Sequence, residues 1–257
     1  MKRLSIIICI GLLALSLSSF AKDVPDAIGI WTFDSVKGDQ VLDISGQGQH
    51  GTILAGGEIT KGKIGNGIKL NGSNQCVEVP HSDVLTVADD QLTMMCWFNW
   101  GAAGDGWQTF FSKGPMSGTN ENWALFINTG AGYFHFITTP NGARINVDSP
   151  GGVVKKNEWQ FVAGTYDGKM IRIYLDGEKI KEQALSGKLT PNKNNLRLGH
   201  REGSSHWWTG MLDEMAAFHR ALDEKEIEQI RKEGFQKFMA VEAETKLPTV
   251  WGRIKSR

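Results

Sequence analysis

Two Asp-Gly pairs in the middle of the chain constrain its fold more than any other feature. Residues 159–166 (WQFVAGTY) and 170–175 (MIRIYL) are each followed directly by Asp-Gly. Asp-Gly between runs rich in β-branched and aromatic residues is a strong signal for a hairpin turn. The sequence therefore predicts three consecutive antiparallel strands that form a meander.

Most of the remaining chain between residues 28 and 219 consists of short apolar segments with no amphipathic helix between them. The 31 glycines follow no fixed period, so they mark turns. The run LTMMCWF at 92–98 is nearly all apolar, as expected for a strand that is covered on both faces. Roughly a dozen short strands at close spacing predict an all-β sandwich of two antiparallel sheets.

One helix is expected near the end of the chain, over residues 222–231. Asp223 is a suitable N-cap, and Leu222, Ile227 and Ile230 can form an apolar stripe. Gly234 should end this helix. Residues 234–257 lack the sandwich pattern, so we expect a C-terminal tail that is loosely docked or serves as a sorting or docking peptide.

The first 21 residues have the pattern of a secretory signal peptide. Lys2 and Arg3 precede an apolar run too short to favour a membrane span, and Ser19-Phe20-Ala21 is a small-x-small cleavage site. We therefore expect a secreted, extracytoplasmic protein whose mature chain has no membrane span. Removal of the segment lowers 28 basic side chains to 26 against 28 acidic ones, so nothing favours nucleic acid as a partner.

Several segments stand in an order typical of one family. They are GIWTFD at 29–34, DISGQGQHG at 43–51, GNGIKLNGSNQCVEVP at 65–80, LTMMCWFNW at 92–100, NEWQFVAGTYDGKMIRIYLDGEKI at 157–180, LRLGH at 196–200 and GMLDEMAAFHRALDEKEI at 210–227. They resemble the bacterial secreted laminin G-like domain of the concanavalin A-like lectin/glucanase superfamily. The resemblance implies a two-sheet antiparallel jelly roll, with its first and last strands side by side. The short helix expected from the residues then follows at the C-terminal end.

Together with the signal peptide, this resemblance divides the chain into three parts. Residues 1–21 are the signal peptide, residues 22–233 the laminin G-like jelly-roll domain, and residues 234–257 the C-terminal tail.

The glycine-rich loop at 43–51 is a candidate cation site. Glycines let backbone carbonyls turn inward, and Asp43 could add a carboxylate, which suits calcium. The resemblance implies a structural calcium ion that joins this loop to the last long strand, which carries Asp213. Asp34, at the end of the first strand, could add another carboxylate. The alternative is that these aspartates only accept hydrogen bonds from turn backbone.

Two cysteines, Cys76 and Cys96, remain once the signal peptide is removed. In an oxidising compartment they could form a disulfide, which requires Cα atoms within roughly 7 Å, or they could be small buried thiols. Both positions depart from the residues common in the resembled family, which keeps the disulfide open.

No catalytic constellation is recognisable, so the sequence predicts a protein that is not an enzyme. The glucanases of the resembled superfamily carry Glu-x-Asp-x-x-Glu on one strand, and this pattern does not occur in the chain. Asp213 and Glu214 form the nearest acidic pair, but neighbouring residues on a strand point to opposite faces. Neither H-E-x-x-H nor G-x-S-x-G is present.

Two loops carry the candidate ligand-binding residues. Residues 101–108 place one tryptophan among glycines, and residues 199–210 gather basic and aromatic side chains. Sugars bind by stacking on aromatic rings and through a few fixed polar groups. The predicted binding residues are Trp107, His200, Arg201, His206 and Trp207. Trp208 is expected in the core, because the resemblance places it there.

The function predicted on this basis is that of a secreted, non-catalytic binding module. Its expected partner is a carbohydrate or a glycosylated surface partner. A protein–protein or matrix adhesion module is the alternative, and a glycoside hydrolase with an unrecognised site is the third possibility. This step rests on family resemblance, because a fold alone does not define a function.

Overall fold

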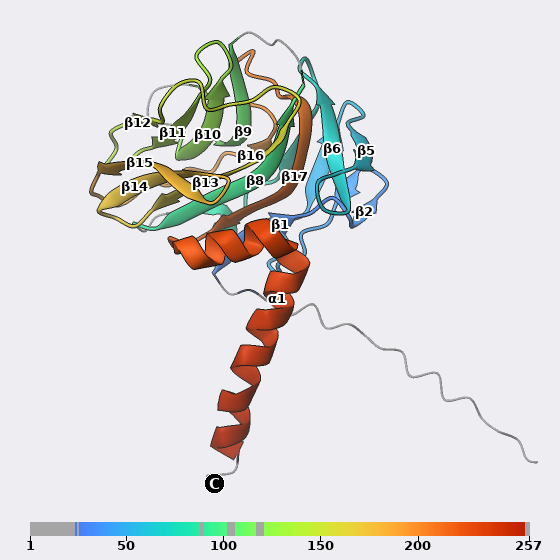
Figure 1. Ribbon diagram of the computed structural model, residues 1–257, viewed down its shortest axis with the longest axis vertical. Helices are drawn as coiled ribbons and strands as arrows, with labels where there is room; N and C mark the ends of the chain where they lie inside the picture. The colour runs from blue at the N-terminus through green and yellow to red at the C-terminus, as the bar shows by residue number, and fades with distance from the viewer. Residues whose placement is uncertain (1–23, 25, 88–89, 102–105, 117–120, 255–257) are drawn as a thin grey trace, which may run out of the picture.

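The computed structural model describes residues 24, 26–87, 90–101, 106–116 and 121–254, with side chains up to residue 240. The signal peptide predicted for residues 1–21 lies outside these residues. Within them, seventeen strands form two sheets stacked face to face, and one helix follows at the C-terminal end (Figure 1). All pairings between named strands are antiparallel, which confirms the predicted all-β jelly-roll sandwich.

The first layer is an eight-stranded sheet. In spatial order it contains β15 (Glu178–Ala184), β14 (Met170–Leu175), β13 (Trp159–Tyr166), β8 (Leu92–Trp100), β17 (Thr209–Phe218), β6 (Asn66–Asn71) and β5 (Glu58–Lys61), with β1 (Ala27–Trp31) also paired to β17. The segment β13–β14–β15 is the meander that the two Asp-Gly pairs predict.

The second layer is a nine-stranded sheet. In spatial order it contains β12 (Ile145–Asp148), β11 (Tyr133–Thr138), β10 (Trp123–Asn128), β9 (Trp107–Lys113), β16 (Leu196–Leu198), β7 (Cys76–Val79), β4 (Gly51–Leu54), β3 (Gln40–Val41) and β2 (Val36–Lys37). A short 3-10 helix, η1 (Asp83–Leu85), follows β7.

The first and last strands of the sandwich lie side by side, as expected. β1 runs antiparallel to the C-terminal half of β17, with Trp31 opposite Met215, and β6 pairs with the N-terminal half of β17. The other edge of β17 pairs with β8 along its length. The last strand is therefore a central strand of its sheet.

The strand β8 is covered on both faces, as its continuous apolar run predicts. Met94, Cys96 and Phe98 point into the core between the two sheets. Met95 and Trp97 point the opposite way and belong to a second apolar cluster beneath the C-terminal helix. Trp208 is fully buried in the core between the sheets, as expected.

The helix α1 (Glu224–Ile254) begins where the sequence predicts. Asp223 Oδ1 accepts hydrogen bonds from the backbone N–H groups of Lys225 and Glu226, both at 2.9 Å. The Glu226 carboxylate accepts in return from the Asp223 N–H at 3.0 Å, which completes a capping box. Ile227 and Ile230 are buried against the eight-stranded sheet, so the predicted apolar stripe is confirmed.

The prediction that the helix ends at Gly234 is only half correct. Gly234 has φ 77° and ψ 167°, which interrupts the helix, but a second helical segment follows at once and continues to residue 254. Phe235 and Phe238 are buried in the same cluster as the first segment. The apolar core therefore extends past the expected boundary at residue 233, and the later turns of α1 project away from the sandwich (Figure 1).

A buried lysine closes the loop before β16. Lys113, at the end of β9, is fully buried, and its Nζ donates to Asn194 O and to Asn192 Oδ1, the latter at 3.0 Å. Asn192 Nδ2 donates to the Lys113 carbonyl at 2.9 Å. Burial lowers the pKa of the Lys113 ammonium to about 8, because the charged form loses its hydration.

In the part of the chain that the structure describes, no helix combines the length and the apolar character needed to cross a membrane.

Candidate ligand-binding site

A pocket opens on the outer face of the nine-stranded sheet. On β10, Leu125 and Ile127 point into the core, so Phe126 between them points outward. On β11, Phe134 and Phe136 fill the core in the same way, which turns His135 outward. Phe126 and His135 are direct cross-strand partners and together form the floor of the pocket.

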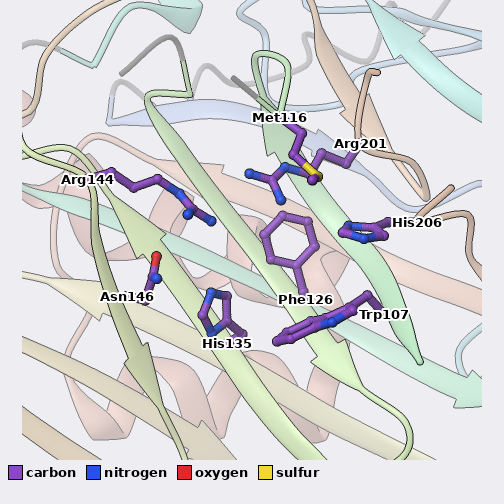
Figure 2. Close-up of a pocket in the computed structure, with 8 residues that line it drawn as sticks. All are labelled: Trp107, Met116, Phe126, His135, Arg144, Asn146, Arg201 and His206. Carbon is purple, nitrogen blue, oxygen red and sulfur yellow. The ribbon is translucent and has the colours of Figure 1, made fainter. Parts of the chain in front are cut away.

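Side chains from separate segments form the walls around this floor (Figure 2). The pocket has a volume of about 320 Å³. Its lining residues in the described chain are Trp107, Met116, Phe126, His135, Arg144, Asn146, Arg201 and His206.

Aromatic rings pack around one side of the pocket and hold it in shape. The Trp107 and His135 rings meet edge to face, with centroids 5.1 Å apart. The His206 ring lies 6.2 Å from both Trp107 and Phe126. Trp107 also contacts Tyr133 edge to face at 5.8 Å. Such contacts restrict the rings before a ligand arrives, which lowers the entropy cost of binding.

Two guanidinium groups share one buried carboxylate at the other side. Glu121 is fully buried, and its Oε2 lies 2.5 Å from Arg201 Nη2 and 3.6 Å from Arg144 Nε. Ser112 Oγ donates to Glu121 Oε1 at 3.2 Å. Burial raises the pKa of Glu121, and the two arginines and Ser112 oppose this rise by favouring the charged form.

Arg201 lies between the aromatic floor and this carboxylate. It is 5% exposed, and its guanidinium carbon lies 5.0 Å from the centre of the Phe126 ring. Its Nε is buried and has no hydrogen-bond partner among the described residues. The guanidinium therefore has more donors than the neighbouring protein groups can use.

His135 is oriented by an acidic partner on the next strand. Its Nδ1 is hydrogen-bonded to Asp148 Oδ1, and the two residues are cross-strand neighbours on β11 and β12. Burial lowers the pKa of His135, and Asp148 opposes this shift. We therefore treat the imidazole as neutral at pH 7, with Nδ1 donating to Asp148.

The structure brings three of the five predicted binding residues together and leaves two aside. Trp107, Arg201 and His206 line the pocket. His200 and Trp207 do not belong to its lining, and their rings stack on each other with centroids 3.4 Å apart and planes 9° apart. Burial lowers the pKa of His200 to about 4. His200 is thus a buried, neutral packing partner for Trp207.

Sequence reasoning missed the residues that the sheet itself supplies. Phe126, His135, Arg144, Asn146 and Met116 line the pocket but come from segments far apart in the sequence. Outward alternation on two neighbouring strands was the available signal for Phe126 and His135, since each stands between two core residues. Strand pairing was needed to place them together.

The three predicted calcium ligands each accept hydrogen bonds from backbone N–H groups. Asp43 accepts from the N–H groups of Ile30, Ser45 and Gln49, all at 2.9 Å. Asp34 accepts from Asn66 N at 2.7 Å. Within the described residues, no group of three or more His, Cys, Asp or Glu side chains is placed to hold one ion.

Asp213 also accepts from backbone N–H groups, and the backbone at Glu214 corrects the expectation that these two carboxyls face opposite sides of the sheet. Asp213 Oδ2 accepts from Lys63 N and Ile64 N at 2.8 and 2.9 Å. A β-bulge follows Asp213, with Glu214 at φ 47°. The strand pattern predicts that the two carboxyls face opposite sides of the sheet. The bulge interrupts this alternation, so that prediction does not hold here. Burial raises the pKa of Asp213 to about 8 and that of Glu214 to about 7.

The two cysteines are free, buried thiols, which corrects the disulfide alternative. Cys96 points into the core from β8 of the eight-stranded sheet. Cys76 lies on β7 of the nine-stranded sheet, where its neighbours Val77 and Val79 point into the core and Cys76 does not. The two side chains therefore leave different sheets, and the thiol of Cys76 points away from the layer that contains Cys96.

The fold and the pocket together define the class of protein. The chain is a two-sheet jelly-roll sandwich with a side-chain pocket on the outer face of one sheet. The family model described as the concanavalin A-like lectin/glucanases superfamily matches residues 71–228. The chain therefore belongs to that superfamily, as the sequence resemblance implies. None of the curated proteins matches the chain by sequence.

Solved structures share the fold at low identity. The binding domain of Paraclostridial Mosquitocidal Protein 1 aligns with a TM-score of 0.65 and 17% identity over 80% of this chain and 52% of its own. The botulinum neurotoxin serotype G binding domain gives 0.64 and 14%, over 80% and 51%. The chain thus spans about half of these toxin domains.

A third structure is matched over nearly its whole length. Domain 4 of AbnA, a GH43 extracellular arabinanase from Geobacillus stearothermophilus solved in complex with arabinotriose, aligns with a TM-score of 0.62 and 18% identity. The alignment covers 80% of this chain and 98% of that domain. At such identities the likeness shows the fold alone.

Proposed function

We propose that this chain is a secreted, non-catalytic binding module whose ligand is a carbohydrate. The observation that carries the proposal is the pocket on the outer face of the nine-stranded sheet, where aromatic rings and polar side chains line one cavity. The extracytoplasmic location rests on the predicted signal peptide.

The two kinds of side chain match the two kinds of surface on a sugar. A pyranose ring has a C–H face that packs on an aromatic ring, and hydroxyls that need hydrogen-bond partners. Trp107 is half-buried and Phe126 forms the floor, so an apolar surface faces the cavity. Arg144 and Asn146 are exposed at the rim and can donate to hydroxyls.

The carboxyl groups around the pocket support a non-catalytic role. Glycoside hydrolysis ordinarily uses two carboxyls on either side of the scissile bond. No carboxylate lines the pocket among the described residues. Glu121 is bound to Arg201 beneath the surface, and Asp148 is bound to His135. Both are engaged in holding the site together.

The comparison with solved structures supports the proposal in outline. AbnA domain 4 has the same fold and was solved with arabinotriose, and the toxin domains are described as binding domains. These are properties of those proteins. They make a sugar ligand a reasonable choice for the pocket of this chain, where the side chains must carry the argument.

A matched pair of tryptophan variants tests the proposal. Glycan arrays identify ligands of the mature protein, and isothermal titration calorimetry then measures their affinity. Trp107→Ala removes the aromatic wall and should weaken binding at least tenfold. Trp207→Ala removes another half-buried tryptophan, one outside the lining, and should leave affinity within about twofold. A tenfold change in affinity corresponds to about 1.4 kcal/mol of binding free energy.

The outcomes are distinct. Equal losses in both variants, or binding that survives Trp107→Ala, would remove this pocket as the sugar site. A mature protein that binds no glycan but captures a protein partner would support the adhesion alternative. Release of reducing sugar from a bound glycan would show that the module is an enzyme.

A further inference from the structure

The charged groups at the pocket suggest which kind of sugar it accepts, and this inference rests on the function proposed above. Arg144 and Arg201 both line the cavity, whereas no acidic side chain does so among the described residues. The two nearby acids are turned toward basic partners. Glu121 binds Arg201 from below, and Asp148 binds the Nδ1 of His135.

One of the two guanidiniums is available to a ligand. Arg201 is buried and makes the 2.5 Å contact to Glu121. Among the described residues, the ion pair of Arg144 is the longer 3.6 Å contact to the same carboxylate, and 34% of its side chain is exposed. Two guanidiniums share a single buried carboxylate on this side of the pocket, and the charge of Asp148 lies on the other side, beside the neutral His135. An incoming anion would meet Arg144 at the solvent-facing side.

On the arginine side of the cavity, donors exceed acceptors. The Nε of Arg201 is buried without a hydrogen-bond partner among the described residues. Asn146 adds an exposed amide beside Arg144. The pKa of His135 is lowered, so this imidazole adds no charge at pH 7, and with Nδ1 donating to Asp148 its Nε2 is an acceptor on the opposite side of the floor from Arg144 and Arg201. The wall therefore suits an acceptor-rich group, and a carboxylate has the planar shape that a guanidinium binds through two parallel hydrogen bonds.

An inorganic anion alone would leave the aromatic side of the pocket without a contact. Figure 2 shows Arg144 and Arg201 on one side of the Phe126 ring and Trp107 on the other. The same cavity thus offers a cationic wall and an aromatic wall. A ligand that fits both has an apolar ring face together with a negative charge at one edge.

We propose that the pocket recognises a sugar that carries a carboxylate, such as a uronic acid, with its carboxylate at Arg144 and its ring against Trp107. The contact is between a guanidinium at the solvent-facing side and an anion, so salt should weaken it.

Paired ligands separate the charge from the sugar. Short oligomers of galacturonate, mannuronate and glucuronate are titrated by calorimetry, each beside its methyl ester, which keeps the ring and removes the charge. We expect at least one acid to bind roughly tenfold or more tightly than its ester, as for a charge-assisted hydrogen bond. Raising the salt concentration should reduce that preference.

Two charge-matched variants assign the preference to a residue. Arg144→Gln removes the exposed guanidinium and should bring the acid close to the affinity of its ester. Lys69→Gln removes one positive charge from β6 in the other sheet, where the side chain is 61% exposed, and should keep the preference. Circular dichroism and melting temperature establish that both variants are folded.

The results also distinguish this inference from the proposed function. Equal affinity for acid and ester, or a preference that persists in Arg144→Gln, overturns the carboxylate assignment. Binding of neutral glycans such as arabinotriose, with no acidic sugar bound, overturns the inference and leaves the carbohydrate function standing. Binding of sulfated glycans alone also overturns the carboxylate assignment, and failure to bind any glycan overturns both.

Discussion

The buried ammonium of Lys113 should give this protein an unusual rise in stability at alkaline pH. The pKa of Lys113 falls from 10.5 to about 8 in the folded chain, because burial removes the hydration of the charge. In the unfolded chain the group keeps its ordinary pKa. Between pH 8 and 10.5 the unfolded state therefore holds a proton that the folded state has released, and linkage makes the free energy of unfolding rise with pH in that window.

The size of the effect follows from the shift. Each pKa unit corresponds to 1.36 kcal/mol, so a change from 10.5 to about 8 amounts to about 3 kcal/mol across the window. Below pH 8 the whole penalty is present, and above 10.5 it is gone. Lys113 is fully buried, so solvent screening reduces the figure little.

Replacement by methionine isolates this contribution. Lys113→Met keeps a long apolar stem but removes the charge and the donors to Asn192 and Asn194. The lost hydrogen bonds shift stability by the same amount at every pH, whereas the lost titration removes the slope. Other groups titrate in this range, including Tyr166 and Cys76, whose pKa values burial raises, but they are present in both proteins and largely cancel in the difference.

Guanidinium chloride unfolding at intervals from pH 7 to 10.5 gives the measurement. The difference in unfolding free energy between the parent protein and Lys113→Met should move by about 3 kcal/mol in favour of the parent as pH rises. The pKa of neighbouring His81 is lowered, so that group is neutral throughout this range. A pH-independent difference would refute the argument that a desolvated ammonium sits at this position.

Further predictions concern the helix kink, the thiols and the metal. Gly234→Ala should lower stability by about 1–3 kcal/mol, since φ 77° with ψ 167° is a glycine conformation and a Cβ would lie 3.1 Å from Glu214 Oε2. The control Gly203→Ala, where a Cβ would meet open space, should cost less stability in urea unfolding. Equal losses of stability in the two variants would contradict a packing role for Gly234. Cys76 and Cys96 should react with a thiol reagent only after denaturation, because both are buried, and a disulfide found by non-reducing mass spectrometry would contradict this. The predicted calcium ion is tested by melting temperature: calcium should raise it and a chelator lower it if the ion binds, and an unchanged value would count against the prediction.

Local sequence signals predicted the parts of the fold that are governed by neighbouring residues. The Asp-Gly pairs located the meander, because each turn needs positive φ at glycine, and Gly168 and Gly177 have φ of 83° and 91°. The cap at Asp223 is also a local feature, because its carboxylate accepts from N–H groups two and three residues further along the chain. The second half of α1 was missed because Gly234 is an ordinary stop signal, and only the burial of Phe235 shows why helical chain continues beyond it.

The binding site was predicted only where its residues are close in sequence. Arg201 and His206 share a loop, and Trp107 stood out among glycines. The same loop predicts Trp207 as an exposed ring beside the basic side chains, and His200 with it, but these two rings stack on each other outside the pocket lining. Phe126 joins the pocket through the pairing of β10 with β11. Arg144 joins through Glu121, which no local pattern connects to it.

The central position of β17 has a consequence for how the chain reaches its native state. β1, β6 and β8 all pair with this last strand, so these three pairings must wait until β17 has been synthesised, although β6 also pairs with β5 and β8 with β13. Such distant pairings slow folding, because loop closure must precede them. The eight-stranded layer should therefore close last, when β17 inserts between strands that are already part of hairpins.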